Sequence, residues 1–136
     1  MVPTDVPGVT QPTASERVKK LRILIVEDHT PTRMAMSRLI RQAGAEVLTA
    51  RDGEEGLSYL LTQRFDVLLT DLRMPKMDGF ELLQHCQTLP DTHRPGRIIA
   101  ISGEYEAGAL HGAPVQFLAK PFNLDVLLDM LSGKPN

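Results

Sequence analysis

Charged and hydroxyl side chains lie at the ends of four short apolar runs in this sequence. They are Glu27 and Asp28 after LRILIV, Asp71 after DVLLT, Ser102 at the end of RIIAIS, and Lys120 after VQFLA. Apolar runs of this length are typical of strands that are buried on both faces of a parallel sheet. Ligands bind such sheets outside the carboxyl ends of the strands, so we expect these side chains to converge there.

Three converging carboxylates need a compensating cation. A pair of like charges about 4 Å apart repels by about 4 kcal/mol at an effective dielectric of 20. Magnesium prefers oxygen ligands and is usually held by one or two carboxylates, waters and phosphate oxygens. Lys120 adds one positive charge, so the pattern predicts a magnesium site with a lysine beside Asp71.

A carboxylate beside a magnesium ion and a lysine is equipped for phosphoryl transfer. Asp71 would attack phosphorus as the nucleophile and form an aspartyl phosphate. The metal and Lys120 would neutralise charge on the phosphoryl oxygens, since such catalysis consists mainly of positioning and electrostatics. Ser102 would donate its hydroxyl to the attached phosphoryl group, and that contact could bias a conformational equilibrium.

Strand-like runs alternate with amphipathic stretches from residue 21 onward. We expect an α/β fold, a doubly wound parallel sheet of five strands with helices on both faces. Thr30 with Pro31, Asp52, Asp78 with Gly79, and Asn123 are expected to begin helices. A short helix is expected over 104–111. The expected strands are 21–26, 46–50, 66–70, 97–102 and 115–119.

The composition is that of one soluble domain. The chain has 136 residues, 42% hydrophobic and 24% charged, which fits a single compact core. A net charge of −2 argues against sequence-independent nucleic-acid binding, and one cysteine favours a reducing compartment. With no membrane span and no secretory signal expected, we predict a cytoplasmic protein. We expect a disordered leader over 1–19, the domain over 20–133 and a tail over 134–136.

Four motifs resemble the receiver domain of two-component response regulators. They are IVED (25–28), LLTDLRMPKMDGFELL (68–83), IAIS (99–102) and FLAKPF (117–122), and the resemblance runs from about residue 21 to 131. It implies a flavodoxin-like sheet with strand order 2-1-3-4-5. It also implies a signalling switch, and the Met1 start with a short tail favours a stand-alone, single-domain regulator.

The resemblance assigns a metal site and a phosphoacceptor. Glu27, Asp28 and Asp71 would hold magnesium together with the backbone carbonyl of Arg73. Asp71 would accept phosphate from a phosphohistidine on a sensor histidine kinase or a histidine phosphotransfer protein. An Arg73–Glu104 pair is expected to cover the site and slow attack by water.

The resemblance also assigns the switch. Ser102 and Phe117 would occupy the hydroxyl and aromatic switch positions, and Lys120 would bind phosphate, with a cis bond to Pro121. The segment from Ser102 to Lys120 is about four residues shorter than is usual in receivers, roughly one helical turn. The fourth helix is therefore expected to be short, and the output surface to differ from the usual one.

Several functions remain open at this point. The protein could be a binding switch for a downstream partner, acting as a monomer or weak dimer, or an intermediate in a phosphorelay. It could be the receiver of a larger transcription factor or hybrid kinase. A phosphoaspartyl hydrolase is the enzymatic alternative, but Asp71 is followed by Leu72 and Arg73, which leaves the acid–base position empty. We expect no enzyme activity beyond self-phosphorylation and slow autodephosphorylation.

Overall fold

The computed structural model describes residues 13–103 and 115–133. Five parallel strands form one sheet in the order β2-β1-β3-β4-β5. The expected fold class and strand order are therefore confirmed. The strands are β1 (Arg22–Val26), β2 (Glu46–Ala50), β3 (Val67–Asp71), β4 (Arg97–Ser102) and β5 (Gln116–Ala119).

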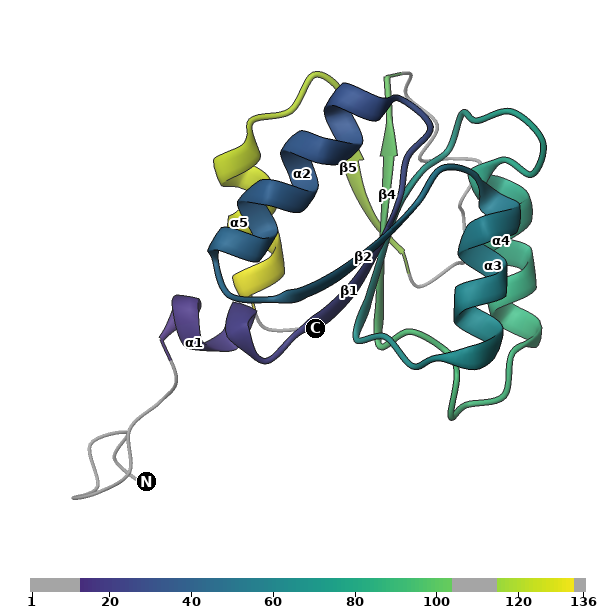
Figure 1. Ribbon diagram of the computed structural model, residues 1–136, viewed down its shortest axis with the longest axis horizontal. Coiled ribbons are helices and arrows are strands. Elements are labelled where there is room, and N and C mark those ends of the chain that lie inside the picture. The colour runs from purple at the N-terminus through teal and green to yellow at the C-terminus, as the bar shows by residue number, and fades with distance from the viewer. Residues whose placement is uncertain (1–12, 104–114, 134–136) are drawn as a thin grey trace.

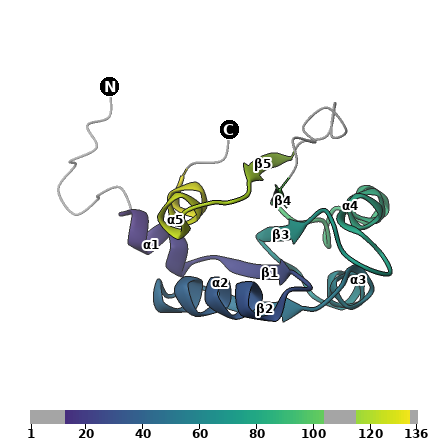
Figure 2. The ribbon, with the colours of Figure 1, turned by 90° about the horizontal axis from the view of Figure 1, so that it is seen from above.

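Helices cover both faces of the sheet (Figure 1). Helices α2 and α5 lie on one face and α3 and α4 on the other, as the view from above also shows (Figure 2). None of the helices in the described part of the chain is long and apolar enough to cross a membrane. The helices are α1 (Ala14–Lys19), α2 (Thr30–Gln42), α3 (Gly53–Thr62), α4 (Gly79–Thr88) and α5 (Leu124–Ser132).

Polar caps begin three of these helices where the sequence predicts. The side chains of Asp52, Asp78 and Asn123 each accept a hydrogen bond from a backbone N–H in the first turn of the helix that follows. Such caps satisfy N–H groups that have no partner within the helix. Helix α2 differs by one residue, because His29 is the cap and Thr30 is already helical.

The sheet separates two apolar clusters. Alternate residues of β1 point to opposite faces, so Ile23 and Ile25 pack under α2 and α5, whereas Leu24 and Val26 pack under α3 and α4. This double burial explains why the first strand is a continuous apolar run. Apolar packing therefore covers both faces of the sheet.

The predicted disorder of residues 1–19 is wrong for the part that the structure describes. Thr13 and Glu16 form a capping box at the start of α1, and Val18 is only 3% exposed. Helix α1 contacts α5, where the Arg17 guanidinium donates to the carbonyl of Ser132. The buried Val18 side chain, the capping box and the hydrogen bond from Arg17 to Ser132 order this segment. It is too short to show apolar periodicity. The helix expected over 104–111 lies outside the described residues.

Candidate functional site

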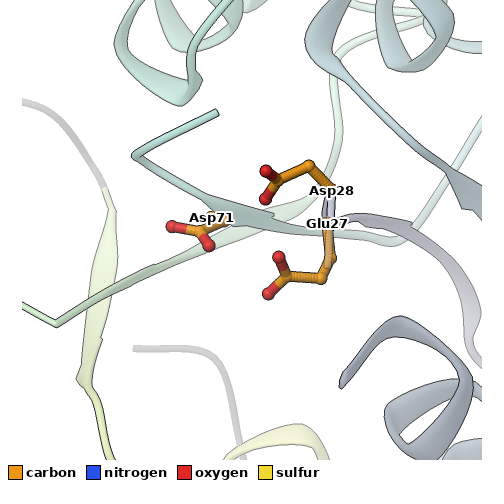
Figure 3. A group of neighbouring side chains, drawn as sticks. All are labelled: Glu27, Asp28 and Asp71. Carbon is orange, nitrogen blue, oxygen red and sulfur yellow. The ribbon is translucent and has the colours of Figure 1, made fainter. Parts of the chain in front are cut away.

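Glu27, Asp28 and Asp71 lie together at the carboxyl edge of the sheet, as predicted. One carboxylate oxygen from each lies within 4.8 Å of the others. Figure 3 shows the Glu27 and Asp28 side chains extending from the end of β1 toward Asp71. Glu27 and Asp71 are 1% and 3% exposed, whereas Asp28 is exposed to solvent. The cluster is therefore buried on one side and open to ligands on the other.

Strand register brings the acidic residues together. Val26 pairs with Thr70 in neighbouring parallel strands, so the next residues, Glu27 and Asp71, lie side by side. Adjacent strands are about 4.8 Å apart, which is close enough for both carboxylates to share one ion. The resemblance implied that these two strands are neighbours, and the structure adds the register that aligns Glu27 with Asp71.

Lys120 lies against two of the carboxylates. Its Nζ is 2.6 Å from Asp71 Oδ2 and 3.6 Å from Glu27 Oε1, and only the first distance is a hydrogen bond. Burial alone would lower the pKa of Lys120, but the hydrogen bond and charge of Asp71, with the charge of Glu27, raise it overall. The lysine is therefore a permanent cation in this site.

Glu27 is left incompletely satisfied. Its Oε2 accepts a hydrogen bond from the His29 N–H at 3.1 Å, but its buried Oε1 has no hydrogen-bond partner among the described residues. Burial, together with the charge of Asp71, raises the pKa of Glu27 to about 7, although the His29 N–H and Lys120 act in the opposite direction. A buried carboxylate oxygen without a partner is costly. A divalent cation would supply what it lacks, so these residues fit magnesium.

Asp71 is held by two donors. Its Oδ1 accepts a hydrogen bond from the Arg73 N–H at 3.0 Å, and its Oδ2 faces Lys120. Sequence reasoning missed the backbone donors of His29 and Arg73, because an N–H group carries no residue-specific signal. The metal-binding role of the Arg73 carbonyl stays a prediction, and Glu104, its expected side-chain partner, lies outside the described residues.

The expected switch residues occupy neighbouring strands. Ser102 ends β4 and is fully buried, and its carbonyl accepts a hydrogen bond from the Lys120 N–H at 2.7 Å. Phe117 on β5 is half-buried and packs against the apolar cluster under α3 and α4. The Lys120–Pro121 bond is cis, as the resemblance implied. Ser102 and Lys120 thus lie at the same sheet edge as Asp71, whereas the switching role of Phe117 stays a prediction.

Known proteins share both the sequence pattern and the fold. The family model described as the response regulator receiver domain matches residues 23–132. The probable chemotaxis protein CheY of Rhizobium etli is 33% identical over 111 residues, 79% of this chain and 86% of that protein. Sensor protein EvgS of Escherichia coli is 37% identical over 118 residues, 84% of this chain but 10% of that protein.

Solved structures of a response regulator and of a receiver domain have folds similar to that of this chain. The chemotaxis response regulator CheY4 of Vibrio cholerae is 32% identical, with a TM-score of 0.73 and coverage of 81% of this chain and 94% of that one. The receiver domain of sensor histidine kinase PA1611 from Pseudomonas aeruginosa, described with magnesium in its active-site cleft, is 26% identical with a TM-score of 0.73. The match covers 84% of this chain and 98% of that one.

The match therefore extends over nearly the whole described fold. The chain spans most of the free-standing CheY relative but only 17% of the sensory/regulatory protein RpfC of Xanthomonas campestris. Receiver domains thus occur both as separate proteins and as parts of larger sensors. On its family match, its relatives and its sheet topology, this chain belongs to the response regulator receiver domain family of two-component signalling.

Proposed function

We propose that this protein is a signalling switch in which Asp71 accepts a phosphoryl group with the help of magnesium. The observation that carries the proposal is the convergence of three carboxylates beside Lys120, with one buried oxygen of Glu27 that has no hydrogen-bond partner among the described residues. Glu27, Asp28 and Asp71 would hold the ion, together with the Arg73 carbonyl. Bound magnesium would neutralise charge on the oxygens of the transferred phosphoryl group.

The protein's own residues would carry the transfer. Asp71 would attack through Oδ2, the oxygen that faces Lys120, so that the lysine can follow the negative charge onto the phosphoryl group, while the Arg73 N–H holds Oδ1. The new bond joins this oxygen to phosphorus, while the phosphorus–nitrogen bond of the donor phosphohistidine breaks and its electron pair stays on the imidazole. The Lys120 ammonium moves from Asp71 to a phosphoryl oxygen. The Ser102 hydroxyl then donates to another phosphoryl oxygen, which draws the end of β4 toward Asp71.

A groove beside Lys120 supports docking of a protein donor. Its volume is about 670 Å³, and it lies between the start of α2 and the segment after β5. Thr32, Ala35 and Met36 line one wall, and Lys120, Pro121 and Phe122 line the other. The proposed donor is a sensor histidine kinase or a histidine phosphotransfer protein. The output would be a changed affinity for a downstream protein or transfer of the phosphoryl group onward, in the cytoplasm.

Intact-mass spectrometry after acetyl phosphate treatment tests the proposal. The wild-type chain should gain one phosphoryl group with magnesium and none with excess chelator. Asp71→Asn should gain none, whereas Asp129→Asn, a matched change at an exposed aspartate of α5, should be labelled like the wild type. Labelling of Asp71→Asn would overturn the assignment of the phosphoacceptor.

A hydrolase of the phosphoaspartyl class has less support. Those enzymes resemble this fold but place a second aspartate two residues after the nucleophile. Here that position is Arg73, and the intervening Leu72 is fully buried. Turnover of a small phosphoester by the purified protein would support the hydrolase instead of the signalling switch.

A further inference from the structure

The turn that carries Glu27 and Asp28 lies beyond the last paired residue of β1. The register of β1 with both neighbouring strands ends at Val26. The Glu27 N–H still reaches the Ala50 carbonyl at 3.1 Å. The Glu27 carbonyl is past the sheet ladder, and a backbone carbonyl near a buried site needs a donor. What holds this turn therefore also holds the two carboxylates.

Arg33, one turn into α2, supplies that donor. Its Nη1 is 2.9 Å from the Glu27 carbonyl oxygen and 3.5 Å from that of Asp28, and its Nη2 is 3.2 Å from Thr30 Oγ1. The guanidinium is a rigid, planar fork that is always charged. Its bonds therefore hold the Glu27 and Asp28 carbonyls in place relative to Thr30. A single side chain thus ties the backbone of Glu27 and Asp28 to the first turn of helix α2.

The contacts of Arg33 differ from those of Lys120. Lys120 pairs with carboxylate oxygens, which a metal ion would share, whereas Arg33 binds the carbonyls behind them. Arg33 therefore brings positive charge to the acidic cluster without occupying any ligand atom. Its bonds can persist when a cation binds.

The other arginines of α2 have different surroundings. Arg41 donates to the Val47 carbonyl at the far end of the helix. Arg38 is exposed, and no hydrogen bond or ion pair to it is seen within residues 13–103 and 115–133. Arg33 is half-buried, and its guanidinium contacts the turn that carries Glu27 and Asp28.

We propose that Arg33 is a positioning residue for the magnesium site, holding Glu27 and Asp28 in their ligating arrangement through the backbone of the turn. This inference rests on the proposed function, because it concerns the same metal site. Residues that orient metal ligands through hydrogen bonds commonly change metal affinity by about 10- to 100-fold when they are removed. The expected loss for Arg33→Ala is about tenfold, since its side chain is only half-buried.

Magnesium affinity, measured by an NMR chemical-shift titration, tests the inference. Arg33→Ala should bind magnesium about tenfold more weakly than the wild type. Its acetyl phosphate labelling rate at saturating magnesium should stay within about twofold, because Arg33 touches no reacting atom. The magnesium affinity of Arg33→Lys should lie between those of the wild type and Arg33→Ala, since one ammonium keeps the charge but cannot bridge the carbonyls and Thr30. Arg38→Ala, the matched control on the same helix, should match the wild type.

Unchanged affinity in Arg33→Ala would overturn the inference. A slower labelling rate with unchanged affinity would also overturn it, because that result assigns Arg33 to donor or phosphoryl contact. If Arg33→Ala does not fold, as judged by circular dichroism, Arg33→Lys decides, and wild-type affinity in that variant counts against the role. Failure of the wild type to bind magnesium would instead refute the proposed function.

Discussion

The ionisation state of Glu27 determines the net charge of the acidic site when no metal is bound. Its carboxyl is almost fully buried beside Asp71, and Lys120 is too far away, at 3.6 Å, to satisfy Oε1. Burial and the neighbouring charge raise its pKa from 4.5 to about 7. A pKa raised on folding stabilises the protein below the unfolded value, and this contribution is lost as the pH rises from 4.5 to about 7. Without metal, the contribution of Glu27 to stability should therefore fall over this range.

Magnesium should stabilise the protein more at high pH than at low pH, through the ionisation of the same carboxyl group. Metal binding requires ionised Glu27, so below about pH 7 the ion must displace a proton. We expect about tenfold weaker magnesium binding at about pH 6 than at about pH 8, and a correspondingly smaller rise in Tm with magnesium. Thermal denaturation with and without magnesium at both pH values measures this. Glu27→Gln is the control without the titrating group, and equal magnesium effects in the wild type at both pH values would contradict the prediction.

A glycine at the start of α4 fixes the approach of that helix to the phosphoacceptor strand. A Cβ at Gly79 would lie 2.2 Å from the Asp71 carbonyl oxygen and 2.7 Å from Leu72 Cα. Both are backbone atoms, so neither can move aside without moving the end of β3. The close approach of helix and strand at this point therefore requires glycine.

Gly79→Ala should destabilise the protein by about 1–3 kcal/mol despite alanine's better helix propensity, because the added methyl overpacks a rigid contact. Urea unfolding measures the change. The matched control is Gly133→Ala after α5, where the nearest atom to a new Cβ is 3.4 Å away. That variant should stay within about 0.5 kcal/mol of the wild type. Equal stability of the two variants would refute the close approach.

Helix α1 is an element that precedes the matched family domain, which begins at residue 23. Val18 inserts into the apolar cluster under α2 and α5, and Arg17 bonds the end of α5. Arg97 from β4 reaches the same helix end, with bonds of 2.9 Å to the Met130 carbonyl and 2.8 Å to the Leu131 carbonyl. The last carbonyls of α5 are therefore satisfied from two sides.

Val18→Ala should lower the free energy of unfolding by about 1–3 kcal/mol, because it removes two buried methyl groups from the core. Ser15→Ala, at an exposed position of the same helix, should change it by no more than about 0.5 kcal/mol. The midpoints of urea unfolding give both values. If Val18→Ala behaves like Ser15→Ala, α1 does not dock on the core in solution.

The whole molecule consists of two apolar clusters that share one sheet. Leu127 of α5 and Leu60 of α3 are both fully buried but lie in different clusters. Because every strand contributes side chains to both faces, neither cluster can open while the sheet stays intact. Small domains of this kind usually unfold in one cooperative step.

Leu60→Ala and Leu127→Ala should each lower stability by about 2–5 kcal/mol. Each variant should show the same unfolding curve by far-UV circular dichroism and by tyrosine fluorescence. Where the double variant still folds, the two losses should add within about 0.5 kcal/mol, because the sites share no partner. Separate transitions for the two probes would show that the two faces unfold independently.

The fold class and the residues of the acidic cluster could both be predicted from residue types and their local order. Apolar runs separated by capped helices predict a parallel α/β sheet, since period and capping are local properties. The positions of Glu27, Asp71 and Lys120 at strand ends then predict one shared edge, which the structure confirms. The disorder expected for residues 13–19 was wrong, because the ordering of α1 depends on a distant partner, α5.

The contacts that hold the site in place became known only from the packing of separate elements. Strand register sets the separation of Glu27 and Asp71, and packing leaves one oxygen of Glu27 without a hydrogen bond among the described residues while Lys120 lies closer to Asp71. The structure also distinguished Arg33 from Arg38, which the sequence places on one helix as equivalent charges. Residue types and their spacing follow from the chain. Distances between side chains from separate elements follow from packing, which no local pattern encodes.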